Sequence, residues 1–214
     1  MSSRWSASVL VSALWLGACA GVPQQYYYTL RSDAAAAPKP ADGKSAGVIV
    51  GPVTIPDLLD RPQWVVRDGP NQLRVLEQQL WAQPLQADVA QAVAAALNRQ
   101  LGDVVAHADV SGLPSLWPVA PRLRVQIDVL RFESRVAPAV AISDEYRWAV
   151  SCFAGKPASA SRTGIATIEA PVPLEDPKTA PYPALAGAHA RGLQQAGQDI
   201  GAALTAIAAS CPSS

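Results

Sequence analysis

The sequence predicts an α+β fold: one twisted, mostly antiparallel sheet with two long helices packed on one face. Segments 84–102 and 185–211 repeat apolar residues every three or four positions, which is typical of amphipathic helices. Segments 122–129 and 146–152 alternate apolar and polar residues, which is typical of half-buried strands. Together with the shorter strand-like segments, these elements follow the order strands, helix, strands, helix, and that order favours the α+β class.

The N-terminus has the pattern of a secretory signal with a lipid-attachment site. Arg4 is followed by an apolar, small-residue run from Ala7 to Ala18, which is shorter than the ~20 residues of a membrane-spanning helix. The run ends in Leu16-Gly17-Ala18-Cys19, which is similar to the lipobox of bacterial lipoproteins. We therefore expect residues 1–18 to be a lipoprotein signal peptide. Cys19 would carry a covalent lipid, with palmitate among its acyl chains, that anchors the protein stably.

The residue after Cys19 is Ala20 rather than Asp, which favours outer-membrane sorting in many Gram-negative bacteria. Residues 19–46 are expected to form the lipidated N-terminus, a short aromatic strand and a flexible tether. A single domain then covers 47–211. The aromatic strand, Tyr26 to Leu30, is expected to be an edge strand packed on the domain, and a partner-binding or membrane-interface patch is the alternative.

Strand signals follow in order along the domain. Residues 48–53 predict a buried strand, with a bulge or an edge at Gly51-Pro52. Segments 63–67 and 73–77 flank Asp68-Gly69-Pro70-Asn71 and predict a hairpin. Residues 163–170 predict a weaker strand near the C-terminal end.

The helix signals are stronger. Pro84 opens the first helix, Gly102 is its expected C-cap, and Trp81 just before it is expected to be a core anchor. The last helix is predicted from an apolar stripe that includes Leu185, His189 and Cys211.

Composition and motifs exclude several kinds of chemistry. The 17 Lys and Arg residues balance 17 Asp and Glu, so nucleic-acid binding driven by positive charge is not expected. The two histidines, His107 and His189, and the cysteines lack metal-ligand spacing, so neither a metal site nor another cofactor is expected. The segment Gly43 to Gly47 matches the G-x-S-x-G pattern around Ser45, but it lies in the tether and precedes a strand, unlike a hydrolase elbow. We expect no enzyme.

With Cys19 lipidated, Cys152 and Cys211 are the remaining cysteines. Both lie on core-facing stripes of a protein expected in an oxidising compartment, so we expect a disulfide between them. Two buried free thiols are the alternative.

After the lipobox, the mature chain has Tyr27-Tyr28-Thr29-Leu30, then Gly51-Pro52 within the run from Val50 to Gln63, and then Trp81-Ala82-Gln83-Pro84-Leu85. With these motifs the mature chain resembles the PqiC-type family of ABC-type transport auxiliary lipoproteins. The family usually has charged residues around this Trp, in a D-R-W-A-E-P-L pattern, whereas this chain has Gln79-Leu80-Trp81-Ala82-Gln83. Cys152 and Cys211 are not part of that pattern.

The resemblance implies a non-enzymatic outer-membrane lipoprotein of an MCE-type system, which moves phospholipid or other lipids between membranes. It would dock the periplasmic MCE-domain protein, served by an inner-membrane permease and ATPase, and it could form a ring of identical subunits. The candidate contact is the loop Pro56-Asp57-Leu58-Leu59-Asp60-Arg61-Pro62, although its Asp60-Arg61-Pro62 corner could equally brace the hairpin. A periplasmic lipid-binding carrier and an assembly lipoprotein for another envelope complex are the alternative functions.

Overall fold

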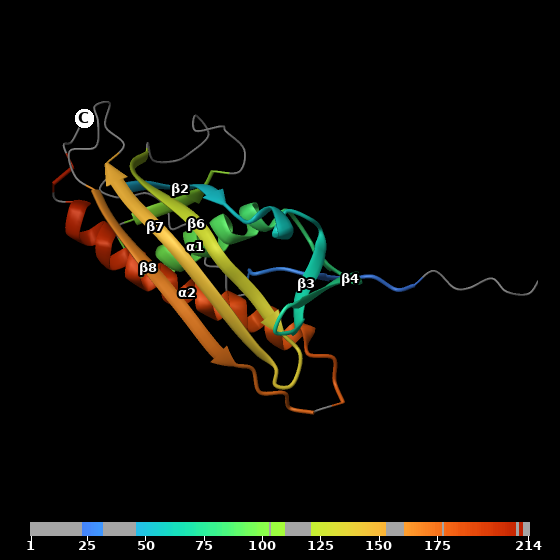
Figure 1. The fold of residues 1–214 in the computed structure, drawn as a ribbon. Coiled ribbons are helices and arrows are strands. Elements are labelled where there is room, and N and C mark those ends of the chain that lie inside the picture. The colour runs from blue at the N-terminus through green and yellow to red at the C-terminus, as the bar shows by residue number, and fades with distance from the viewer. Residues whose placement is uncertain are drawn as a thin grey trace, which may run out of the picture.

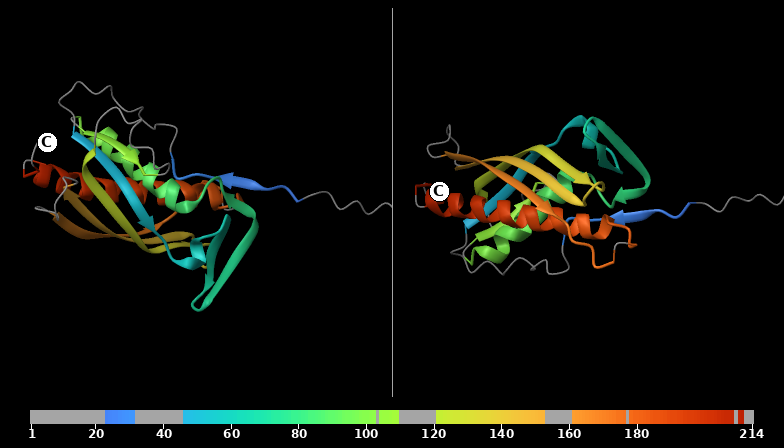
Figure 2. Two further views of the ribbon diagram at one scale, coloured as in Figure 1. Left: turned by 90° about the horizontal axis from the view of Figure 1, so that it is seen from above. Right: turned by 60° about the horizontal axis from the view of Figure 1, so that its bottom comes forward.

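The protein forms a mixed eight-stranded sheet with two helices on one face, as the α+β prediction requires (Figures 1 and 2). The computed structural model describes residues 23–31, 46–102, 104–109, 121–152, 161–176, 178–208 and 210–211. The strands are β1 (Tyr26–Tyr28), β2 (Ala46–Thr54), β3 (Gln63–Gly69), β4 (Gln72–Trp81), β5 (Val104–Ala108), β6 (Pro121–Arg135), β7 (Ala141–Cys152) and β8 (Ser161–Pro171). The helices are α1 (Leu85–Gln100) and α2 (Tyr182–Ala208), with a short 3-10 helix, η2 (Asp57–Leu59).

The sheet branches at the long strand β6. On one edge β6 pairs antiparallel with β7, which in turn pairs antiparallel with β8. On the other edge it pairs in parallel first with β2, as far as Asp128, and then with β3 from Ser134 onward. Between these two ladders, residues 129–133 of β6 have no register partner on that edge among the described strands. The longest ladders, β6–β7 and β7–β8, are therefore antiparallel. The pairings of β1 with β4, of β2 with β5 and of β2 with β6 are parallel.

The interruption predicted at Gly51-Pro52 is present as a register shift between Val50 and Val53, where β2 runs along β6. Gly51 has φ +149°, and a Cβ there would lie 2.7 Å from the Cβ of Asp109. Only glycine satisfies both conditions without strain. The bulge shifts the register, and β2 pairs with β6 again at Val53 and Thr54 before the chain passes on to η2.

The core lies between the helices and the sheet. α1 contacts β2 and β5, and α2 contacts β6, β7 and β8. The helices approach closely at Gly197, where a Cβ would lie 2.8 Å from the Cβ of Ala96. Trp64, Tyr146, Leu97 and Leu193 are among the large side chains that this layer buries completely or nearly so. The expected alternation holds in β7 and in β6 up to Val129, because every second residue there faces this core. A register shift between Val129 and Arg131 then interrupts it, and the next buried residue of β6 is Phe132.

Two helix ends differ from the expectation. The C-cap of α1 is Leu101 in an extended conformation, not Gly102, and among the described glycines only Gly51 has a positive φ. The last helix ends at Ala208, so Cys211 lies in the following turn and not on the helix stripe. The chain after α2 turns back to the sheet, where the guanidinium of Arg122 donates to the carbonyl oxygen of Cys211 (3.0 Å).

Candidate functional site

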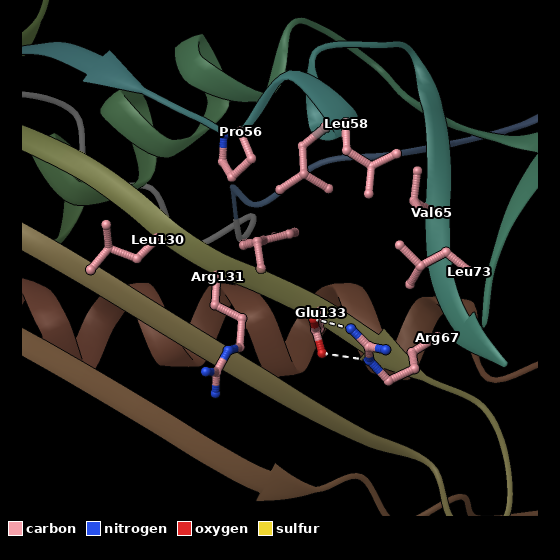
Figure 3. Close-up of a pocket in the computed structure, with 10 residues that line it drawn as sticks. Pro56, Leu58, Val65, Arg67, Leu73, Leu130, Arg131 and Glu133 are labelled. Carbon is pink, nitrogen blue, oxygen red and sulfur yellow. Dashed lines mark hydrogen bonds and ion pairs between the residues drawn. The ribbon is translucent and has the colours of Figure 1, made fainter. Parts of the chain in front are cut away.

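The gap in the β6 ladder is an apolar pocket of about 220 Å³ that opens to solvent (Figure 3). It lies between β6, the β3–β4 hairpin and the segment that carries η2. We call it the β6 pocket, and it is lined by Pro56, Leu58, Leu59, Val65, Arg67, Leu73, Leu130, Arg131, Phe132 and Glu133. Leu58 and Leu73 both line this pocket and are each 41% exposed, so together they offer apolar surface to an incoming group.

The sequence places η2 beside this pocket. The amides of Leu59 and Asp60 donate to the carbonyl oxygens of Pro56 (2.8 Å) and Asp57 (3.2 Å), which closes a single tight turn. Because a turn this short buries little of its own surface, Leu58 remains exposed while Leu59 is half-buried against the core. The turn therefore presents one leucine outward from a fixed backbone.

The predicted contact loop, 56–62, has two parts with different surroundings. Pro56, Leu58 and Leu59 line the β6 pocket. Asp60 instead accepts a hydrogen bond from Gln86 at the start of α1 (3.2 Å). The carbonyl oxygen of Pro62 accepts from the amide of Trp81 (2.8 Å). The first half of the loop thus forms pocket surface, and the second half is bonded to the domain.

The charges at the mouth of the pocket are paired. Arg67 Nε donates to Glu133 Oε2 at 2.8 Å, and a second guanidinium nitrogen donates to Oε1 (Figure 3). This hydrogen bond to Arg67 lowers the pKa of Glu133 below its usual value. Arg131 lies 3.8 Å from both Glu145 and Glu169. With its rim charges compensated, the pocket suits an apolar group better than an ion.

A buried carboxylate fastens the N-terminal strand to the domain. Asp88, completely buried at the start of α1, accepts from the amide of Leu30 (2.8 Å), the hydroxyl of Thr29 (3.0 Å) and the amide group of Gln83 (2.7 Å). We call this the Asp88 clasp. Since β1 pairs only with the end of β4 among the described strands, the clasp supplies much of what holds this segment in place.

The aromatic strand divides between core and solvent. Tyr28 contacts Trp64 edge to face, with ring centroids 5.1 Å apart, and burial raises the pKa of Tyr28. Trp81 is buried and packs on Trp64 at 4.4 Å, so the predicted core anchor is present. Tyr26 and Tyr27 are 47% and 62% exposed. The expected edge strand is therefore packed on the domain at Tyr28, whereas Tyr26 and Tyr27 face solvent.

Gln79 and Gln83 occupy positions that have charged residues in the D-R-W-A-E-P-L pattern of the family. Gln79 Oε1 accepts a hydrogen bond from the hydroxyl of Tyr28 (2.6 Å), and Gln83 is part of the Asp88 clasp. The corner before α1 is therefore held by neutral amides.

A buried polar network joins four elements behind the pocket. Ser134 Oγ lies 2.8 Å from His189 Nε2, and His189 Nδ1 lies 2.9 Å from Asp144 Oδ2. Trp64 Nε1 donates to Ser134 Oγ at 2.9 Å. The hydroxyl of Tyr146 donates to Asp144 Oδ2 at 2.9 Å. His189 also stacks on Phe132, with centroids 4.0 Å apart, so the network ties α2 to β3, β6 and β7.

Ser134, His189 and Asp144 have the connectivity of a serine-hydrolase triad, but their surroundings differ. All three side chains are 0% exposed, and no substrate carbonyl could reach the serine oxygen. Ser134 Oγ is moreover occupied by the indole of Trp64. The arrangement is a structural connection within the core, and His189 is a packed histidine, as expected. His107, on β5, is half-buried, and burial lowers its pKa.

The structure joins Cys152, at the end of β7, to Cys211 by a disulfide, with Cα atoms 5.7 Å apart. Both cysteines are buried. Cys19 and Ser45 lie outside the described residues. Within the described ranges, no helix has the length and apolar character needed to cross a membrane, and no group of three or more potential ligands is placed to hold a metal ion.

These features define a helix-covered α+β domain with a fastened N-terminal strand and an open apolar pocket. The model of the family "ABC-type transport auxiliary lipoprotein component" matches residues 28–201. The chain belongs to this family, whose members are lipoproteins that assist ABC-type transport, which implies a place in the cell envelope.

Solved structures agree with the fold. A protein from Xanthomonas campestris, XCC0632, is similar with a TM-score of 0.57 and 25% identity, over 86% of this chain and 95% of that one. An uncharacterised protein is similar with a TM-score of 0.60 and 20% identity, over 83% of this chain and 97% of that one. No curated protein matches the chain.

Proposed function

We propose that the protein is the outer-membrane-anchored subunit of an MCE-type system that moves phospholipid between membranes, of the PqiC type. Cys19 carries the anchor, and the domain docks the periplasmic MCE-domain protein, whose permease and ATPase lie in the inner membrane. Its role is to position the MCE assembly and so to support envelope integrity. The energy for transport comes from the other subunits.

The β6 pocket is the observation that carries this proposal. Its volume of about 220 Å³ is smaller than the ~300–1,000 Å³ typical of ligand sites, so it is suited to one or two side chains. Side-chain anchors that enter such pockets supply most of the binding energy of many protein interfaces. The exposed Leu58 and Leu73 flank the entrance, and the rim charges are already paired. An apolar anchor of the MCE-domain protein is the occupant we propose.

Phospholipid carriage by the domain itself has less support. A carrier would hold an acyl chain between the sheet and the helices, and in the described structure buried side chains such as Leu97, Leu193 and Tyr146 occupy that layer. In this proposal the protein lies at the membrane surface and holds no lipid in its core. A ring of identical subunits would place several β6 pockets around one MCE assembly.

Co-purification tests this proposal. The full-length lipoprotein is isolated from membranes in mild detergent beside a Cys19→Ala variant, and the proteins that accompany each are identified by mass spectrometry. We expect an MCE-domain protein, with or without permease and ATPase, with the wild type and much less of it with the variant. Recovery of an unrelated envelope complex would favour an assembly lipoprotein instead.

A further inference from the structure

We propose that Tyr26 and Tyr27 form a contact with the headgroup layer of the membrane that carries the lipid anchor. The inference rests on the proposed lipidation of Cys19. It assigns to this part of the chain a lipid surface as partner, in addition to the protein partner of the β6 pocket.

The two tyrosines lie close in sequence to the residue that carries the proposed anchor. Tyr26 follows Cys19 by 26 − 19 = 7 residues. A chain spans at most ~3.3–3.6 Å per residue, so Tyr26 lies within about 25 Å of the lipidated residue. The coil that leads into β1 projects beyond the helices and the rest of the sheet (Figures 1 and 2), and Tyr26 and Tyr27 follow it where β1 pairs with the end of β4. This end of the described molecule is therefore the one nearest in sequence to the proposed anchor.

The chemistry of the segment is the second argument. Between Cys19 and Arg31 the sequence has no charged side chain. Tyrosine has an apolar ring and a polar hydroxyl, and it is enriched where a protein passes through the membrane–water interface. Tyr26 and Tyr27 are 47% and 62% exposed, whereas the next residue, Tyr28, packs on the core. The domain leaves these two rings uncovered close to where the described chain begins.

The Asp88 clasp would transmit such a contact to the whole domain. It holds Thr29 and Leu30 directly after the strand, so β1 is not a loose tether but a fixed part of the domain. A headgroup contact at Tyr26 and Tyr27 would restrict how the whole domain is oriented over the membrane. The β6 pocket would then be held at a defined angle to the bilayer.

The test uses the lipidated, disulfide-bonded protein with a Tyr27→Cys substitution labelled with an environment-sensitive fluorophore. The parent protein without the added cysteine shows that no other thiol takes the label. An Ile165→Cys variant is the matched control, because Ile165 is 60% exposed but lies on β8 at a distance from the anchored end. Both labelled proteins are reconstituted into phosphatidylethanolamine–phosphatidylglycerol vesicles, with and without a headgroup-level nitroxide lipid.

We expect a blue shift and nitroxide quenching at position 27, and neither at position 165. A label at position 27 that is insensitive to nitroxide while the protein floats with the vesicles would overturn the contact and leave the anchor intact. In that outcome the exposed tyrosines serve a protein surface instead. Protein that carries no lipid by intact mass, or does not float, would overturn the anchoring and the contact together.

A second variant tests whether the rings themselves make the contact. A label at Gln25→Cys is compared with the same label in a Tyr26→Ser, Tyr27→Ser background. Because both tyrosines are exposed, the melting temperature should not change. We expect quenching at position 25 to fall when the tyrosines are replaced, and unchanged quenching would contradict their role.

Discussion

His189 Nδ1 lies 2.9 Å from Asp144 Oδ2, with both side chains completely buried between α2 and β7. The carboxylate oxygen that accepts from His189 also accepts from the hydroxyl of Tyr146, and burial raises the pKa of that hydroxyl well above its usual value. The pair joins the C-terminal helix to the sheet by polar contacts, in a layer whose packing is mostly apolar.

Asp144→Ala should therefore destabilise the protein strongly. The substitution leaves the donors on His189 and Tyr146 buried without an acceptor, and each such group costs about 1–3 kcal/mol. Urea unfolding should show a loss of about 2–6 kcal/mol in the free energy of unfolding. Asp128→Ala is the control, because Asp128 lies at the surface. Its ion pair with Arg147 (3.8 Å) contributes about 1 kcal/mol or less, and its hydrogen bond from the hydroxyl of Thr54 (2.6 Å) is exposed to water. Equal effects of the two substitutions would contradict a structural role for the network.

Asp88→Ala should loosen the N-terminal strand. Three hydrogen bonds to the carboxylate would be lost, and the amide of Leu30 would have no acceptor in the core. We expect a loss of about 2–4 kcal/mol in unfolding free energy, because bonds to a charged acceptor contribute ~1.5–3 kcal/mol each without being additive. Hydrogen exchange should accelerate at residues 28–30 more than in α2. Uniform acceleration across the domain would argue that Asp88 supports α1 and not the strand.

Removal of the disulfide should lower stability without changing the fold. Cys152 and Cys211 are separated by 59 residues. Closing a loop of that length corresponds to about 4 kcal/mol in the loop-entropy model, and measured values are typically ~2–4 kcal/mol. Cys152→Ser should therefore lower the urea concentration at the midpoint of unfolding and leave the circular dichroism spectrum of the folded protein unchanged. Two titratable thiols in the unreduced, denatured wild type would show that the bond does not form.

Because of the Arg67–Glu133 pair, the free energy of unfolding should decrease as the pH becomes acidic. Arg67 lowers the pKa of Glu133 in the folded protein, so the pair stabilises the fold above the unfolded pKa of glutamate, ~4.3. This contribution is lost as the pH falls through the lower folded pKa. The side chains are 28% and 32% exposed, so it should be about 1 kcal/mol or less.

Urea unfolding of the wild type and of Glu133→Gln at pH 7 and pH 3 measures this difference. The wild type should be the more stable protein at pH 7, and the gap should narrow at pH 3. A gap that stays constant between the two pH values would show that Glu133 acts through packing alone.

Local patterns predicted the elements well, because helix and strand periodicity depend on near neighbours. The alternation in 122–129 and 146–152 and the stripe from Leu185 identified β6, β7 and α2. The branch at β6 could not be predicted in the same way, since it depends on which strands pair across long sequence separations. For the same reason, Leu130 and Phe132 could not be assigned to the pocket, although the resemblance pointed to the loop at Pro56 to Pro62.

The buried network had a signal that sequence reasoning left unused. Asp144 lies on the core-facing stripe of β7 between Ile142 and Tyr146, and His189 lies on the core-facing stripe of α2. A carboxylate at such a position is almost never buried without a partner. The two stripes could thus have predicted the pair, whereas Ser134 and Asp88 carry no comparable mark in the sequence.

Site-specific photo-crosslinking in intact cells tests most directly whether the β6 pocket docks an MCE-domain protein. A photoreactive amino acid replaces Leu58 at the pocket entrance, and Ile165 on β8 is the matched exposed position. The account predicts that the product at position 58 contains an MCE-domain protein, identified by mass spectrometry, and that this product is absent at position 165. Equal products at both positions, or a position-58 product containing only unrelated proteins, would contradict docking through the pocket.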